Sequence, residues 1–265
     1  MSSTTLSRSL RYAESEVIAY RRTWRGTVIT SFVNPVFFLA AMGLGLGQMV
    51  DGGTVQSLPI PYLTLVASGL MAANAMQNGA SDGSFPVMAG IMWRKNFLGT
   101  VTTPLGPADI VLGRLIWGVG RLLFVLVVFA VIAVIFGALD LGPAMMGIAP
   151  AVLTGVAFTT AITAWTLTQK DGRSLSTLFR FLIVPLFLFS GTFFPISQLP
   201  DWLEPVAYFT PLFHGVELVR KVALPGVDES IVSSIPTWVH VAYLVAMALA
   251  GLYLSIRLLD KRIRQ

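Results

Sequence analysis

The chain has 265 residues, of which 55% are hydrophobic and 12% are charged, and it carries a net charge of +5 at pH 7. This small number of polar side chains cannot cover the surface of a water-soluble protein of this size. The composition therefore predicts an all-α polytopic membrane protein. The absence of cysteine excludes disulfide bonds, a thiolate nucleophile and cysteine-ligated metals. The basic residues are scattered between apolar runs, which argues against nucleic-acid binding.

The amino-terminal stretch, residues 1–25, contains several arginines but no apolar core of the length that a signal peptide needs. One face of this stretch is apolar and the others are basic or polar, which predicts an amphipathic helix at the cytoplasmic membrane surface. A frayed basic tail is the alternative. The apolar positions at helical spacing are Leu6, Leu10, Ala13, Val17 and Tyr20.

Six apolar runs follow, each close to the ~20 residues that cross a bilayer. They cover about 27–48, 58–80, 110–136, 144–168, 178–194 and 236–256. Six crossings place both termini on one side of the membrane. If that side is the cytoplasm, only Arg220 and Lys221 among the 18 lysines and arginines lie outside, which agrees with the positive-inside rule. We therefore expect a single transmembrane domain over residues 1–265, with both termini cytoplasmic.

Three glycines in the first run, Gly43, Gly45 and Gly47, resemble a phosphate-binding loop, but no Lys-Ser or Lys-Thr pair follows them. Gly43 and Gly47 also form a GxxxG pattern, which favours close packing between membrane helices. The nucleotide-binding pattern GxxxxGK[ST] occurs nowhere in the chain. If ATP drives this protein, another chain binds the nucleotide.

The longest predicted cytoplasmic connection, residues 81–109, carries aromatic side chains beside two cations. This mixture is typical of a short helix that docks into a groove on a partner, with aromatic anchors and charges that set the register. The alternative is that Trp93 belongs to the aromatic belt of the membrane interface and the cations only follow the positive-inside rule. The residues that we expect at this contact are Ile91, Met92, Trp93, Arg94, Lys95, Asn96 and Phe97.

Arg121 stands alone within the third predicted span. Its side chain can extend back to the inner interface, which lies about 9 Å away along the helix. The other interpretation is a contact with an anionic head group or diphosphate at the cytoplasmic mouth of a substrate pathway. The predicted spans contain no acidic residue to pair with Arg121, which supports this second interpretation.

The segment 195–230 cannot be a plain spanning helix, because prolines at 195, 200, 205 and 211 interrupt it. The pattern predicts two re-entrant half-helices on the outer side, at about 200–208 and 211–223, with Thr210 capping the second. We expect them to form a lid over the exit. The residues of this outer gate are Phe193, Phe194, Pro195, Trp202, Pro211, His214 and Glu217.

His214 and Glu217 lie one turn apart and could together ligate a metal, yet the only other histidine is His240 and no second cluster accompanies it. We therefore predict no metal site and an ordinary amphipathic helix at the outer interface. No combination of serine, histidine and acid has the spacing of a hydrolase, so we predict no catalytic residues.

Two motifs resemble those of ABC-2-type exporter permeases. Residues 100–118, TVTTPLGPADIVLGRLIWG, are similar to the Thr-Thr-Pro segment that follows the coupling helix in that family. Residues 191–220 are similar to its Gly-x-Phe-Phe-Pro, Leu-Pro-x-Trp-Leu and Pro-Leu-x-His elements. The pattern is most similar to the branch of nodulation-factor lipo-oligosaccharide permeases, with drug and polysaccharide exporters close to it. The stretch FPVMAGIMWRKN departs from the family's strongly charged coupling helix.

The resemblance implies a permease subunit of an ATP-driven exporter in the inner membrane of a bacterium. It implies two permeases, identical or related, each resting on a nucleotide-binding subunit that holds ATP and Mg²⁺, and no cofactor or ATPase site in this chain. The cargo would be amphipathic: a glycolipid, a lipid-linked saccharide or a hydrophobic drug. Lipid is the other expected partner.

Two other classes of membrane protein serve as alternatives. An ion-coupled secondary transporter needs ionisable residues or broken helices near the midplane, and apart from Arg121 the predicted spans carry charges only near their cytoplasmic ends, at Arg114 and Arg180. A membrane-embedded lipid or glycan transferase needs a catalytic acid or base facing a cavity, and the sequence indicates none.

Overall fold

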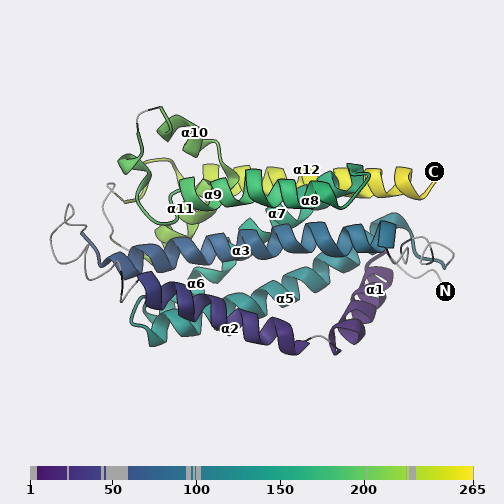
Figure 1. Ribbon diagram of the computed structural model, residues 1–265, viewed down its shortest axis with the longest axis horizontal. Helices are drawn as coiled ribbons and strands as arrows, with labels where there is room; N and C mark the ends of the chain where they lie inside the picture. Colours follow the sequence, from purple (N-terminus) through teal and green to yellow (C-terminus); the bar gives the residue numbers. More distant parts are fainter. Residues whose placement is uncertain are drawn as a thin grey trace.

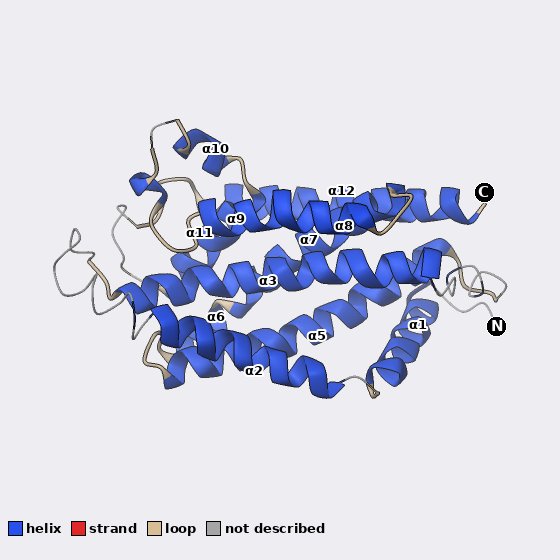
Figure 2. Ribbon diagram, in the orientation of Figure 1, coloured by secondary structure: helices blue, strands red, loops and turns tan. Residues whose placement is uncertain are grey.

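The described part of the chain consists of helices joined by loops and turns and contains no strand (Figure 2). The computed structural model describes residues 5–22, 24–42, 45, 59–93, 97, 99, 103–200, 202–224, 226 and 231–264. For these residues the predicted all-α class is confirmed. The predicted contact through Gly43 and Gly47 lies outside the described residues, as do Arg94, Lys95 and Asn96.

The helices form an elongated bundle whose two ends differ (Figure 1). The steeply inclined α1 and the C-terminal end of α12 lie at one end, and α10 and α11 lie near the other. The elements are α1 (Thr5–Tyr20), α2 (Trp24–Ala40), α3 (Tyr62–Met88), η3 (Ala89–Trp93), α5 (Pro107–Ile135), α6 (Leu141–Met146), α7 (Ile148–Thr168), α8 (Arg173–Leu178), η4 (Phe179–Ile183), α9 (Val184–Phe189), η5 (Ile196–Gln198), α10 (Glu204–Tyr208), α11 (Pro211–Ala223) and α12 (Thr237–Ile263).

Three helical segments in the described residues are long and apolar enough to cross a membrane. They are Pro107–Ile135, Leu141–Thr168 and Thr237–Ile263. Helix α3 has 27 residues, the same length as α12, but is not apolar enough to meet that description. The count of six spans therefore stays a prediction.

Small residues bring the central helices into close contact. A Cβ atom added to Gly79 of α3 would lie 2.3 Å from the carbonyl oxygen of Gly155 on α7, and one added to Gly83 would lie 2.6 Å from Thr159 O. On α12, a Cβ atom on Gly251 would lie 2.6 Å from Ala161 N of α7. Helices in lipid gain little from hydrophobic burial against one another, so such close backbone packing supplies much of their attraction.

Two helix boundaries differ from the sequence prediction. Helix α3 continues past the predicted end at Ala80 to Met88 and then into η3, so part of the expected cytoplasmic connection is helical. The fifth run was expected to reach Phe194, but α9 ends at Phe189. Gly191 follows with a φ of +82°, a backbone conformation that glycine adopts readily, and this turn reverses the chain before Pro195.

Candidate functional site

Helix α1 packs closely across α5. A Cβ atom on Gly113 would lie 2.6 Å from Ser9 O, and Ser9, Tyr12 and Ala13 are the buried residues of α1. The predicted amphipathic helix is thus present, but the sequence reasoning missed the face that contacts α5. The apolar side chains of Leu6, Leu10 and Val17 stay exposed. They remain available for the membrane surface that the sequence predicted.

Ion pairs fix both halves of α1. Arg8 Nη1 lies 3.8 Å from Asp109 Oδ2, and Arg114 Nη1 lies 3.2 Å from Glu16 Oε1. Tyr12 lies between these pairs along α1, and burial raises the pKa of its hydroxyl to about 12. The hydroxyl therefore stays protonated at physiological pH. These links make α1 and the first turns of α5 one mechanical unit.

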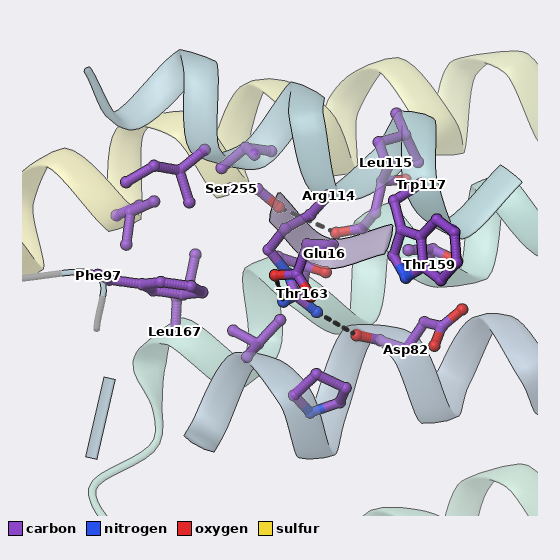
Figure 3. Close-up of a pocket in the computed structure, with 17 residues that line it drawn as sticks. Glu16, Asp82, Phe97, Arg114, Leu115, Trp117, Thr159, Thr163, Leu167 and Ser255 are labelled. Carbon is purple, nitrogen blue, oxygen red and sulfur yellow. Dashed lines mark hydrogen bonds and ion pairs between the residues drawn. The ribbon is translucent and has the colours of Figure 1, made fainter. Parts of the chain in front are cut away.

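The ionic contacts continue from α1 through α5 to α3. Arg114 Nη2 donates to the backbone carbonyl of Asp82 at 3.4 Å, and Arg121 Nη2 lies 2.6 Å from Asp82 Oδ1. Figure 3 shows Arg114 between Glu16 and Asp82. The expectation that Arg121 lacks an acidic partner is therefore wrong. Because α3 extends beyond Ala80, Asp82 lies on the helix beside α5 and not in a loop. We call Glu16, Arg114, Asp82 and Arg121 the charged network.

A cavity of about 90 Å³ adjoins the charged network (Figure 3). Residues from α1, α3, α5, α7 and α12 line it, including Arg114, Asp82 and the hydroxyl-bearing Thr159, Thr163 and Ser255. A cavity of this volume has room for a few water molecules at most. In this conformation it is too small for a bulky cargo.

The predicted coupling residues are only partly exposed. Trp93 is 60% exposed, as expected for a docking anchor, and Ile91 and Met92 are half-buried. Phe97 is only 2% exposed, so its expected place on the docking surface is wrong. The ring of Phe97 fits against Gly90 and lies 5.7 Å from the Arg114 guanidinium. The coupling segment therefore touches the charged network through Phe97.

At the other end of the bundle, α11 begins and ends where the sequence predicted. Thr210 is the N-cap, and its hydroxyl accepts a hydrogen bond from Phe213 N at 3.4 Å. The helix is more deeply buried than an interfacial amphipathic helix is expected to be, because every residue from 212 to 220 is buried. Its place on the outer side of the membrane stays a prediction. Helix α11 packs against α3, α7 and α12, and a Cβ atom on Gly215 would lie 2.4 Å from Thr154 Oγ1. The first half-helix, α10, starts at Glu204, later than expected.

The charged side chains of α11 hold the two flanking loops. Arg220, which is 1% exposed, donates from Nη2 to the Gly191 carbonyl at 2.6 Å. Glu217 Oε2 accepts a hydrogen bond from Ser233 N at 2.6 Å, and Lys221 Nζ donates to the Ile235 carbonyl. Burial lowers the pKa of Arg220 to about 10, so the guanidinium remains charged at neutral pH.

His214 and His240 contact one another, which the sequence analysis did not anticipate. Their Nδ1 atoms lie 2.8 Å apart, joining α11 to the first turn of α12, and Tyr243 stacks on His214 at a centroid distance of 4.0 Å. The two histidines are 26 residues apart in the sequence, on different helices, so no helical or motif spacing could have predicted their contact. No group of three or more His, Cys, Asp or Glu that could hold a metal occurs among the described residues.

The remaining predicted gate residues differ in how exposed they are. Trp202 is 74% exposed, Pro195 is buried and Phe194 is half-buried. Phe193 makes an edge-to-face contact with Phe187 of α9 at 5.0 Å. Pro211 occupies the first turn of α11, as predicted.

Comparison with known families matches residues 12–224 to the ABC-2 type transporter family. The chain belongs to this family. It is 28% identical over 251 residues to Nodulation protein J of Sinorhizobium fredii, an alignment that covers 93% of this chain and 90% of that protein. It is 25% identical to Nodulation protein J of Bradyrhizobium diazoefficiens, with the same coverage, and 21% identical over 234 residues to Inner membrane transport permease YadH of Escherichia coli, covering 88% and 89%.

The resemblance to ABC-2-type permeases predicted from the motifs is thus confirmed. In this ABC-2 type transporter, the matched region starts at Tyr12 in α1 and ends at Leu224, just after α11. Both the charged network and the buried half-helix therefore lie within the part of the chain that matches the family, except for the contacts that α11 makes with α12.

Proposed function

We propose that the chain is the transmembrane subunit of an ATP-driven exporter that moves an amphipathic cargo outward. ATP and Mg²⁺ would bind to a separate nucleotide-binding subunit, present in two copies, and a second permease, identical or related, would complete the pathway. The family match over residues 12–224 carries this proposal. The chain would cross a bacterial inner membrane six times, with both termini in the cytoplasm; α1 and the end of α12 lie at the same end of the bundle (Figure 1).

Coupling to the ATPase would occur at that end. Closure of the nucleotide-binding subunits would push on the segment from Ile91 to Phe97 and on α1. Phe97 rests near Arg114, and Arg114 is bonded to both Glu16 and Asp82, so a displacement at the surface reaches α1, α3 and α5 together. A packed, hydrogen-bonded unit transmits such a shift better than a loose loop does.

Release of the cargo would be controlled by α10 and α11 at the opposite end. The exposed Trp202 and the buried α11 lie near the predicted exit, and the bonds from Arg220, Glu217 and Lys221 fix α11 to the chain on either side. The half-helices would thus act as a gate without binding the cargo chemically.

The cargo is proposed to be a glycolipid or lipid-linked saccharide in the first place and a hydrophobic drug in the second. The relative named Inner membrane transport permease YadH supports a role in transport. The motif resemblance to lipo-oligosaccharide permeases favours the glycolipid, and an apolar helical bundle suits a cargo with a lipid chain.

One observation favours the second candidate, an ion-coupled secondary transporter. Asp82 and Arg121 form an ion pair between α3 and α5, where the sequence had indicated no acidic residue. Proton or ion transport uses such intramembrane pairs. The transferase alternative gains no comparable observation.

Co-expression with an ATPase encoded beside this chain tests the proposal. We expect the two to co-purify, and we expect inverted membrane vesicles to accumulate cargo when ATP is added. Replacing the lysine of GxxxxGK[ST] in the ATPase should abolish accumulation, and collapse of the proton gradient should leave it intact. Transport that persists without the ATPase and stops when the gradient collapses would establish the secondary transporter instead.

A further inference from the structure

One face of α3 is polar over about two and a half turns, from Asn74 to Asp82. Its residues follow the spacing i, i+3, i+4, i+7 and i+8, which places them on one side of a helix. We call this face the α3 polar stripe; it consists of Asn74, Gln77, Asn78, Ser81 and Asp82. The opposite face carries small residues that pack against α7. A Cβ atom added to Gly79 on this face would lie 2.3 Å from Gly155 O. Helix α3 thus turns its smallest side chains inward and its polar side chains away from that contact.

The polar stripe is open in the structure. Gln77 is exposed, and Asn74 and Asn78 are half-buried. Asn78 donates to both the carbonyl and the side-chain oxygen of Asn74, at 2.9 and 2.8 Å. The side-chain amide of Gln77 forms no hydrogen bond with any other described residue. An amide facing hydrocarbon without a partner costs several kcal/mol. The stripe therefore faces water or a polar molecule and not acyl chains.

The charge of this region decides which polar molecule fits. Two cations of α5 contact the stripe at Asp82, and each has an acidic partner: Arg121 pairs with Asp82 at 2.6 Å, and Arg114 pairs with Glu16 at 3.2 Å. The amides of Asn74, Gln77 and Asn78 both donate and accept hydrogen bonds, as hydroxyl groups do. A region without net charge has no means of preferring an anion, and it matches an uncharged, hydroxyl-rich group.

Aromatic rings flank the same face. A small cavity of about 30 Å³ lies between α2, α3, α5 and α9, where Asn74 and Gln77 meet Asn34. The exposed ring of Phe38 and the half-buried ring of Phe187 line it as well, whereas the ring of Phe129 is buried. The cavity itself is too small for a sugar. A sugar lying across this face would form hydrogen bonds with the amides through its hydroxyls and pack its C–H faces on Phe38 and Phe187.

We propose that the α3 polar stripe binds the uncharged, hydroxyl-rich head group of the cargo while the lipid chain of the cargo remains in the membrane. This inference rests on the proposed export of an amphipathic molecule and names the class of its head group. It replaces the anionic head group or diphosphate that an unpaired Arg121 would have favoured.

Because the chain contains no cysteine, single cysteines report directly on this face. Gln77→Cys tests the stripe, and Ser81→Cys is a second, conservative variant in case the first assembles poorly. Leu249→Cys is the matched control, since Leu249 lies near the middle of the equally long α12 and its apolar side chain is 61% exposed. The complex is studied in membrane vesicles with a charged, water-soluble thiosulfonate reagent.

We expect Gln77→Cys and Ser81→Cys to react at least about tenfold faster than Leu249→Cys, because the charged reagent enters hydrocarbon far less readily than water. Adding monoglucosyl dioleoylglycerol should slow the reaction at the stripe, and dioleoyl phosphatidic acid should not. Equal, slow reaction at all three positions would overturn the proposal. So would a disulfide between two copies at position 77, which would make the stripe an interface, and so would protection by phosphatidic acid or by neither lipid.

The outcome is independent of the ATPase. If cargo transport proves not to need ATP, the proposed exporter function fails, but the reaction rates and their protection by the glycolipid still report on the stripe. If transport needs ATP and the glycolipid gives no protection, only the head-group assignment fails.

Discussion

His214 on α11 and His240 on α12 share a hydrogen bond, with their Nδ1 atoms 2.8 Å apart. Such a bond needs one nitrogen to donate and the other to accept, so it fails when both rings are fully protonated. The rings also lie against Phe213 and Tyr243, which leaves two positive charges poorly solvated. The junction between the half-helix and the last long helix therefore depends on the protonation of this pair.

Acidification is expected to weaken this junction. Burial lowers the pKa of His214 below its usual value. Since the folded pKa is below that of the unfolded chain, about 6.5, the contribution to stability is present above that pH and is lost as the pH falls below it. We expect the purified protein to melt at a lower temperature at pH 5.5 than at pH 7.5. The melting temperature of a His214→Gln, His240→Gln double variant should fall less between pH 7.5 and pH 5.5. An equal fall in both proteins would contradict this account.

The Asp82 and Arg121 pair should behave as a unit. Arg121→Leu leaves the carboxylate of Asp82 without its partner, and Asp82→Asn leaves the guanidinium without its counter-charge. Because each side chain is only about a fifth exposed, each change should destabilise the protein by about 1–3 kcal/mol. Melting temperature and export would both fall.

Exchange of the two charges is the control. The Asp82→Arg, Arg121→Asp double variant restores opposite charges, so its melting temperature should exceed those of Asp82→Arg and Arg121→Asp alone. No recovery in the exchanged protein would indicate that the two residues act separately, with Arg121 reaching the membrane interface as a lone cation.

Sequence patterns predicted the helical class, the family and the limits of α11, because each depends on local signals. Thr210 before Pro211 specifies a helix start, and runs of apolar residues specify membrane segments. Contacts between distant elements could not be predicted in this way. Asp82 meets Arg121 only because α3 continues past Ala80, and the burial of α11 depends on how it packs on α3, α7 and α12. Neither follows from composition or spacing.

Close packing between α3 and α7 should be sensitive to a single methyl group. Gly79→Ala places a Cβ atom 2.3 Å from Gly155 O, which requires the helices to separate. The cost of such overpacking is about 1–3 kcal/mol. Gly120→Ala is the matched control, since a Cβ atom there meets nothing within 4 Å and alanine favours the helix. We expect the melting temperature to fall for Gly79→Ala only; an equal fall for both variants would show that the packing is not the cause.

Arg220 is expected to hold α11 against the turn that ends the fifth run. Arg220→Met keeps the apolar stem of the side chain but removes the hydrogen bond to the buried Gly191 carbonyl, which then lacks this donor at a cost of about 1–3 kcal/mol. Arg257→Met, an exposed arginine on α12, is the control for loss of a charge. We expect Arg220→Met alone to lower the melting temperature and to raise ATP hydrolysis relative to cargo exported, because a loosened gate uncouples the two. Nucleotide affinity should stay unchanged, since α11 lies near the end of the bundle opposite α1 (Figure 1). Normal coupling in Arg220→Met would mean that α11 is a structural plug and not a gate.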